Sequence, residues 1–123
     1  MAAATRILLV EDEAIIRIMT AEFLQDAGFD VVEAWDGDEA VRLLDGADSF
    51  DVLLTDVQMP GSLDGVDVAI HARQLHQDIP VLVTSGYAPY LVTRLAVLSP
   101  AAVYISKPYN LQEILNAVGG STR

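Results

Sequence analysis

Short runs of β-branched and other apolar residues alternate along this chain with longer segments in which apolar residues recur every three or four positions. The short runs predict five strands, at Ile7–Val10, Val31–Ala34, Val52–Thr55, Val81–Thr84 and Val103–Ile105. Because a segment of helical period separates each strand from the next, the pattern predicts a parallel sheet with helices on both faces. We therefore expect an open, doubly wound α/β domain, in which ligands bind at the carboxyl ends of the strands.

Segments of helical period fill the intervals between the strands and follow the last one. The first helix is predicted to end at Gly28, and the second to start near Asp36-Gly37-Asp38. The third is predicted at 65–75 and the fourth at 89–98, and the last begins after its cap, Asn110, and ends at Gly119-Gly120. The residues expected to face the sheet are Ile16, Met19, Phe23 and Ala27, then Ala40, Val41 and Leu44, then Val68, Ala69, Ala72 and Leu75, and finally Leu111, Ile114, Leu115 and Val118.

The size and composition of the chain suit a single domain. It has 123 residues, of which 52% are hydrophobic, and we expect the domain core to run from about residue 6 to residue 118. No apolar run approaches the roughly 20 residues that a membrane-spanning helix needs. The first residues also lack the basic start and apolar stretch of a secretory signal, so we expect a cytoplasmic protein with no membrane partner.

Charge and cysteine content narrow the classes of ligand. The net charge is −11 and the isoelectric point is near 4.2, which would repel nucleic-acid phosphates, so we expect no direct nucleic-acid binding. The chain has no cysteine, so disulfides and thiolate metal sites are excluded. Any metal must therefore be bound by oxygen or imidazole ligands.

Acidic and other polar residues follow several of the predicted strands. Glu11 and Asp12 follow the first strand, Asp56 the third, Thr84 ends the fourth, and Lys107 follows the fifth. Carboxylates at one edge repel one another unless a cation compensates them, and Mg²⁺ takes one or two carboxylates together with other oxygen ligands.

Simpler interpretations exist for each of these residues. Acids after a strand can start a helix, which is the interpretation we favour for Glu13. Asp56 taken alone could be a turn residue, and a lysine after a strand could extend into solvent. Lys107 is the only lysine in a chain that otherwise uses arginine, however, and it would meet acids from two other strand ends. We therefore favour a functional acid cluster.

Other chemistries have weaker support in the sequence. The segment around Ser85-Gly86 lacks the first glycine of a GxSxG nucleophile motif. No Walker loop or GxGxxG motif follows the first strand, so a nucleotide site of either kind is not predicted. A carboxylate nucleophile is the best remaining candidate.

Five motifs run in order from Arg6 to Val118: ILLVEDE, LLTDVQMPG, Asp64-Gly65, IPVLVTS and YISKP. Each is short, but at this order and spacing the chain specifically resembles the receiver domain of bacterial two-component response regulators. The resemblance implies a flavodoxin-like fold with a five-stranded parallel sheet in the order 2-1-3-4-5. It also implies that Asp56 accepts a phosphoryl group from a phosphohistidine of a sensor histidine kinase. Turnover of a separate substrate is not expected.

The resemblance further implies a Mg²⁺ site and a switch. Asp12 and Asp56 would bind Mg²⁺ directly, Glu11 would act through water, and the backbone carbonyl of Gln58 would complete the protein ligands. The resemblance also implies that Lys107 binds one phosphoryl oxygen and that the hydroxyl of Thr84 binds another. Tyr104 would turn inward behind Thr84. The surface of the fourth helix, fifth strand and fifth helix would then change its binding of a downstream protein. A homodimer through that surface is a further option that the sequence leaves open.

Some features depart from the usual family pattern, and some alternatives remain. The loop GSLD between Pro60 and Gly65 is one residue longer than the commonest form, and Ser85 stands where alanine is frequent, followed by Gly86-Tyr87. Gln58 could contact an attacking water, so we expect it to control the lifetime of the phosphoryl group. We expect a stand-alone response regulator; the alternatives are a phosphorelay intermediate that donates to a histidine phosphotransfer protein, a receiver fragment of a hybrid kinase, and a protein-binding module that is not phosphorylated.

Overall fold

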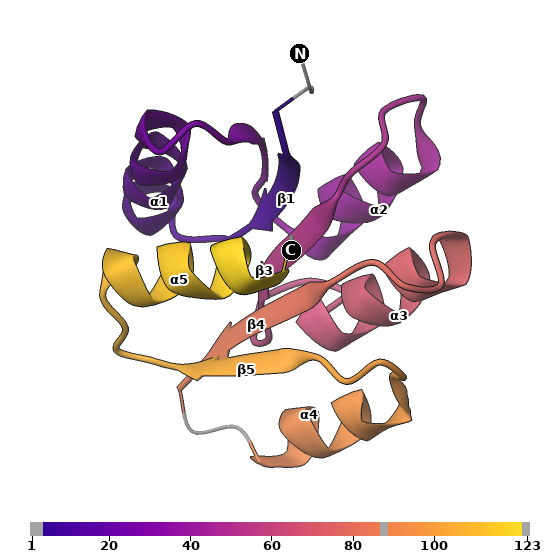
Figure 1. Ribbon diagram of the computed structural model, residues 1–123. Helices are drawn as coiled ribbons and strands as arrows, with labels where there is room; N and C mark the ends of the chain where they lie inside the picture. The colour runs from indigo at the N-terminus through magenta and orange to yellow at the C-terminus, as the bar shows by residue number, and fades with distance from the viewer. Residues whose placement is uncertain (1–3, 87–88, 122–123) are drawn as a thin grey trace.

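The five strands form one parallel sheet in the order β2-β1-β3-β4-β5, which confirms the predicted fold class (Figure 1). The computed structural model describes residues 4–86 and 89–121. Its strands are β1 (Arg6–Val10), β2 (Asp30–Ala34), β3 (Val52–Asp56), β4 (Val81–Ser85) and β5 (Val103–Ser106). Each observed strand is one residue longer than its prediction, at one end.

Helices follow each strand in the chain. They are α1 (Ala14–Asp26), α2 (Gly37–Asp45), α3 (Gly65–Leu75), α4 (Pro89–Arg94) and α5 (Leu111–Ser121), and a 3₁₀ turn, η1 (Leu95–Val97), follows α4. The fourth predicted helix is therefore part α-helix and part 3₁₀ turn. Among the residues described, no helix has the length and apolar character needed to cross a membrane.

The helices cover the two faces of the sheet unequally. In Figure 1, α1 and α5 lie on one face and α2, α3 and α4 on the other. Successive strand residues point to opposite faces, so Leu8 packs toward α2 and α3 while Ile7 packs toward α1 and α5. Both faces of the central strands β1, β3 and β4 are therefore buried, which explains why these strands are nearly continuous apolar runs, whereas the edge strands β2 and β5 are partly exposed.

The predicted inner face of α1 was wrong in part. Met19 is 55% exposed and Ala27 is also exposed, whereas Thr20, Ala21 and Leu24 are the buried residues of this helix. Apolar residues occur on most sides of α1, so their periodicity is compatible with more than one orientation. The structure places the small Ala21 and the larger Leu24 in the core shared with α5.

Two further details of the helices differ from the prediction. Leu75 is 44% exposed because it is the last residue of α3, and Ile79, in the loop beyond it, is buried on that side of the sheet instead. Gly119-Gly120 does not end the last helix, which continues to Ser121, where the hydroxyl donates to the carbonyl of Ala117 at 2.8 Å. Gly28 does end α1, with a φ of 100° that favours glycine.

Short polar side chains fix the starts of three helices. Asp36 accepts a hydrogen bond from the Glu39 N–H at 2.8 Å at the start of α2. Asn110 accepts one from the Glu113 N–H at 2.8 Å before α5. The third start, at Asp64, is a reciprocal capping box, in which the side chains of Asp64 and Asp67 each accept a hydrogen bond from the backbone N–H of the other. These caps make the turns between strands and helices short and definite, which positions the residues at the carboxyl edge of the sheet.

Candidate functional site

The carboxyl edge of the sheet gathers polar residues that are far apart in the sequence. Asp56, the last residue of β3, is paired in register with Thr84 of β4. Glu11 follows β1 directly, and Lys107 follows β5 directly. Because parallel strands end at the same edge, the structure brings together these four residues that the sequence pattern singled out.

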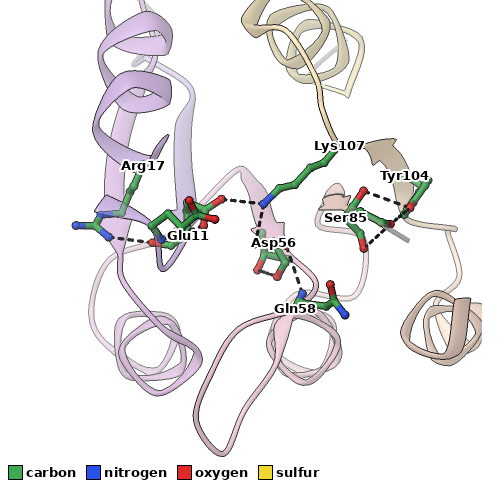
Figure 2. A network of polar contacts seen from close by, with 10 residues as sticks. Glu11, Arg17, Asp56, Gln58, Ser85, Tyr104 and Lys107 are labelled. Carbon is green, nitrogen blue, oxygen red and sulfur yellow. Dashed lines mark hydrogen bonds and ion pairs between the residues drawn. The ribbon is translucent and has the colours of Figure 1, made fainter. Parts of the chain in front are cut away.

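The ammonium group of Lys107 binds two acids at this edge. Its Nζ lies 2.9 Å from Oδ2 of Asp56 and 3.3 Å from Oε1 of Glu11 (Figure 2). The backbone N–H of Lys107 donates to the carbonyl of Ser85 at 2.6 Å, which holds the start of the side chain beside β4. Both acids are buried, so this lysine is a structural part of the site and does not extend freely into solvent.

Asp12 completes a cluster of three acids. One carboxylate oxygen from each of Glu11, Asp12 and Asp56 lies within 4.8 Å of the others, and Asp12 is the less buried member. The three acids carry more negative charge than Lys107 can balance. All three donors are hard oxygens, the ligands that Mg²⁺ prefers, so the residues present fit a divalent cation.

Burial governs the ionisation of this cluster. Burial raises the pKa of Asp56, although hydrogen bonds from Lys107 and from the Gln58 N–H oppose this effect. The pKa of Glu11 is also raised, chiefly by burial; the Glu13 N–H opposes the rise and the charge of Asp56 adds to it. Burial alone would lower the pKa of Lys107, but the hydrogen bond to Asp56 and the charges of both acids outweigh it and raise that pKa. Lys107 therefore stays positively charged, and a second cation would reduce the electrostatic repulsion among the acids.

Gln58 reaches Asp56 through its backbone. Its N–H lies 3.3 Å from Oδ1 of Asp56, so the two oxygens of this carboxylate have different partners, Gln58 and Lys107. The Gln58 side chain is exposed at the same edge. The family resemblance implies that its carbonyl is a metal ligand, but the contact from its N–H was not predicted.

Two glycines let the loop 57–64 lie close to its neighbours. A Cβ at Gly65 would collide with the backbone oxygen of Asp56, and a Cβ at Gly37 would collide with Leu63. Only glycine therefore allows α3 to begin directly against Asp56 and the loop to pack on the start of α2.

The two residues expected to form a switch lie on adjacent strands. Thr84 is buried beside Asp56, whereas Tyr104 is 42% exposed. The hydroxyl of Tyr104 lies 2.9 Å from the carbonyl of Gly86 and 3.4 Å from that of Ser85 (Figure 2). Tyr104 thus connects β5 to the chain directly after Thr84. Tyr87, which the sequence also singled out, lies outside the described residues.

Sequence reasoning missed Arg17. Its Nη1 donates to the backbone carbonyl of Glu11 at 2.9 Å (Figure 2). Its Nε lies 3.3 Å from Oε1 of Glu33 on β2. The only available signal was an arginine about one turn into the helix that follows the acids. A backbone acceptor leaves no mark in the sequence, so this contact required the structure.

Comparison with known proteins gives a consistent picture. The family model described as the response regulator receiver domain matches residues 7–119. The transcriptional regulatory protein CpxR of Escherichia coli is 38% identical over 110 residues, which cover 89% of this chain and 46% of CpxR. The transcriptional regulatory protein PdtaR of Mycobacterium tuberculosis is 33% identical over 120 residues, covering 95% of this chain and 56% of PdtaR. The chain therefore spans about half the length of these curated relatives.

Solved structures agree with the sequence relatives. The crystal structure of a response regulator receiver protein from Sinorhizobium medicae matches with a TM-score of 0.87 and 30% sequence identity. That match covers 97% of this chain and 94% of the other, so the similarity extends over nearly the whole fold.

Proposed function

Because this chain belongs to the family of response regulator receiver domains, we propose that it accepts a phosphoryl group on Asp56 from a phosphohistidine of a sensor histidine kinase. The observation that carries the proposal is the double contact of Lys107 with Asp56 and Glu11 beside Asp12. A half-buried lysine and three clustered acids are the charges that phosphoryl transfer to a carboxylate needs.

The transfer uses one carboxylate of this chain as the nucleophile. A carboxylate oxygen of Asp56 attacks phosphorus, the bond from phosphorus to the imidazole nitrogen breaks, and an acyl phosphate forms on Asp56. Lys107, whose Nζ is 2.9 Å from Oδ2 of Asp56, stabilises negative charge on the transferring group. The Gln58 N–H helps to orient the carboxylate from its other oxygen.

The three acids would hold Mg²⁺ in this reaction. Asp12 and Asp56 are the proposed direct ligands, with the Gln58 carbonyl, and Glu11 would act through water. When bound, Mg²⁺ supplies positive charge that balances the acids and the phosphoryl oxygens. This proposal is supported by the separation of at most 4.8 Å among the acid oxygens and by the raised pKa values of Asp56 and Glu11.

Signal output is proposed to pass through Thr84 and Tyr104. The Thr84 hydroxyl would bind a phosphoryl oxygen on Asp56, and the segment 85–86 would move with it. Tyr104 would then exchange its contacts with the carbonyls of that segment for an inward position. A population shift of this kind would change the surface of α4, β5 and α5 and its affinity for a downstream protein. With a net charge of −11, the chain is not proposed to contact DNA itself, although its relatives are transcriptional regulators.

The test is phosphorylation by acetyl phosphate with Mg²⁺, followed by intact mass measurement. We expect wild-type protein to gain the mass of one phosphoryl group and Asp56→Asn to gain none. Asp26→Asn, at the exposed end of α1, is the matched control and should be modified like wild type. Removal of Mg²⁺ with a chelator should abolish the reaction. Equal modification of Asp56→Asn and wild type would refute the proposal.

A further inference from the structure

Arg17 connects α1, the loop after β1, and β2 through a single guanidinium group. Nη1 donates to the Glu11 carbonyl at 2.9 Å, and Nε lies 3.3 Å from Oε1 of Glu33. The side chain is only 15% exposed, although its partner Glu33 is at the surface. In Figure 2, Arg17 lies on the side of Glu11 opposite Lys107. Arg17 therefore binds the backbone carbonyl of Glu11, and Lys107 binds its carboxylate from the other side.

The bond to the Glu11 carbonyl bears directly on Asp12. The carbonyl of Glu11 and the N–H of Asp12 belong to the same planar peptide group, so fixing one fixes the orientation of the other. Two further hydrogen bonds hold this segment: the Glu11 N–H donates to the Ala34 carbonyl at 3.1 Å, and the Glu13 N–H to Oε2 of Glu11 at 3.1 Å. Of these three hydrogen bonds, the one from Arg17 is accepted by the peptide group that joins Glu11 to Asp12.

The geometry points to arginine rather than lysine at this position. A guanidinium presents several N–H groups in a rigid plane, so it can bind Glu11 and Glu33 at the same time. An ammonium on a flexible stem is a point charge and is poorly suited to hold both acceptors in fixed directions. The contact with Glu33 orients the guanidinium plane of Arg17. The hydrogen bond to the Glu11 carbonyl then fixes the orientation of the Glu11–Asp12 peptide.

We propose that Arg17 is a positioning residue for the cation site, which holds the Glu11–Asp12 peptide so that both carboxylates face Asp56. This inference rests on the proposed function only in assigning the acids to Mg²⁺. Arg17 touches neither the acids' carboxylates nor Asp56, so its effect is on the affinity for the metal and not on the chemistry at Asp56.

The test is direct titration of metal-free protein with MgCl₂ by calorimetry, using Arg17→Met, Arg17→Lys and wild type. We expect Arg17→Met to bind Mg²⁺ about tenfold more weakly, at the lower end of the range seen when a partner that orients a metal ligand is removed. Arg17→Lys should recover only part of the loss. Arg42→Met is the matched control, because Arg42 pairs with Glu39 on the exposed side of α2 and should leave the affinity unchanged.

A second measurement separates positioning from general damage. The initial rate of phosphorylation by acetyl phosphate should fall in Arg17→Met at limiting Mg²⁺ and return to the wild-type value at saturating Mg²⁺. If circular dichroism shows that Arg17→Met does not fold, Glu33→Gln decides: a weaker Mg²⁺ affinity supports the proposal, and an unchanged one overturns it. A folded Arg17→Met with wild-type affinity also overturns it.

The outcomes distinguish this inference from the proposed function. If wild type binds Mg²⁺ but Asp56 takes no phosphoryl group, the proposed function fails and the titrations still test Arg17. If Asp56 is phosphorylated and Arg17→Met binds Mg²⁺ like wild type, the role of Arg17 alone fails. If wild type binds no Mg²⁺, both fail.

Discussion

Two clusters, each of one cation and two carboxylates, lie at the two ends of the loop 57–64. The edge cluster consists of Lys107 with Asp56 and Glu11, and the cap cluster consists of Arg94 of α4 with Asp64 and Asp67 at the start of α3. In the edge cluster the acid side chains are 8% and 3% exposed; in the cap cluster they are 21% and 32% exposed. The two clusters thus share a charge composition but differ in burial.

Their acids also differ in ionisation. The pKa values of Asp56 and Glu11 are raised, chiefly by burial. Burial acts in the same direction on Asp67, but hydrogen bonds from the Asp64 N–H and from Arg94 outweigh it, and the pKa of Asp67 is lowered. An ion pair therefore does not by itself show the function of the charged cluster that contains it. The cap cluster stabilises the fold, whereas the more deeply buried edge cluster adjoins a third acid, Asp12, and the added negative charge favours binding of a further cation.

The largest expected effect comes from removing the cation of the edge cluster. In Lys107→Met, we expect the rate of phosphorylation by acetyl phosphate at saturating Mg²⁺ to fall by about 100-fold or more, the usual loss when one group that stabilises transition-state charge is removed. Stopped reactions analysed by intact mass would give the rate. Lys107→Arg, which keeps the charge but not the compact ammonium, should recover only part of it. A wild-type rate in Lys107→Met would remove the functional distinction between the two clusters.

A smaller effect is expected on stability from Asp56→Asn. A raised carboxyl pKa means that the folded state holds the proton more tightly than the unfolded state, so ionised Asp56 opposes folding. With chelator present at neutral pH, Asp56→Asn should therefore be more stable than wild type, by on the order of 1 kcal/mol. The gain should shrink as the pH falls through the raised folded pKa and vanish below 3.8, the ordinary aspartate pKa, because Asp56 is then neutral in both states.

Urea unfolding of both proteins at several pH values provides the measurement. Adding Mg²⁺ should stabilise wild type more than Asp56→Asn, since a ligand that binds the folded state alone raises its stability. A metal-free Asp56→Asn that is less stable than wild type at neutral pH would show that the edge cluster stabilises the fold as the cap cluster does.

Most of the edge cluster was predictable from the sequence because its members are placed by local structure. A strand buried on both faces is a continuous apolar run, so its carboxyl end can be located to within a residue. Asp56 and Thr84 were found in this way, whereas Lys107 follows the largely exposed edge strand β5 and was singled out as the only lysine of the chain. The predicted sheet then implied that they meet, as the pairing of Asp56 with Thr84 and the bond from Lys107 to Asp56 show.

The contacts that were missed depend on tertiary structure. Arg17 and the Gln58 N–H act through backbone groups, which every residue has, so no residue type announces them. The orientation of α1 was missed because apolar residues lie on most of its sides, and packing against α5 chooses among them. Arg94 reaches Asp64 and Asp67 across 30 and 27 residues, a separation that helical periodicity cannot detect.

The cap cluster has a geometry that should confer stability and little else. The guanidinium of Arg94 places Nη1 2.8 Å from Oδ2 of Asp64 and Nη2 2.9 Å from Oδ1 of Asp67. The same two aspartates form the reciprocal capping box of α3, in which each side chain accepts the backbone N–H of the other. Arg94 of α4 thus binds the N-terminus of α3, which the capping box already stabilises. Neither aspartate belongs to the cluster of acids that could hold a metal.

The smallest effect is therefore expected from Arg94→Met. Because the Arg94 side chain is 33% exposed, solvent screens its ion pairs, and the free energy of unfolding should fall by only about 0.5–1 kcal/mol near pH 7. Because folding lowers the pKa of Asp67, its ionised form stabilises the folded state above pH 3.8, the unfolded-state value. This stabilisation is lost as the pH falls through the folded-state pKa, so the difference in unfolding free energy between Arg94→Met and wild type should narrow in acid. Urea unfolding near neutral pH and well below pH 3.8 would test this sign. The rate of phosphorylation at Asp56 should stay at the wild-type value, and a large loss of that rate would mean that the two clusters are coupled through the loop 57–64.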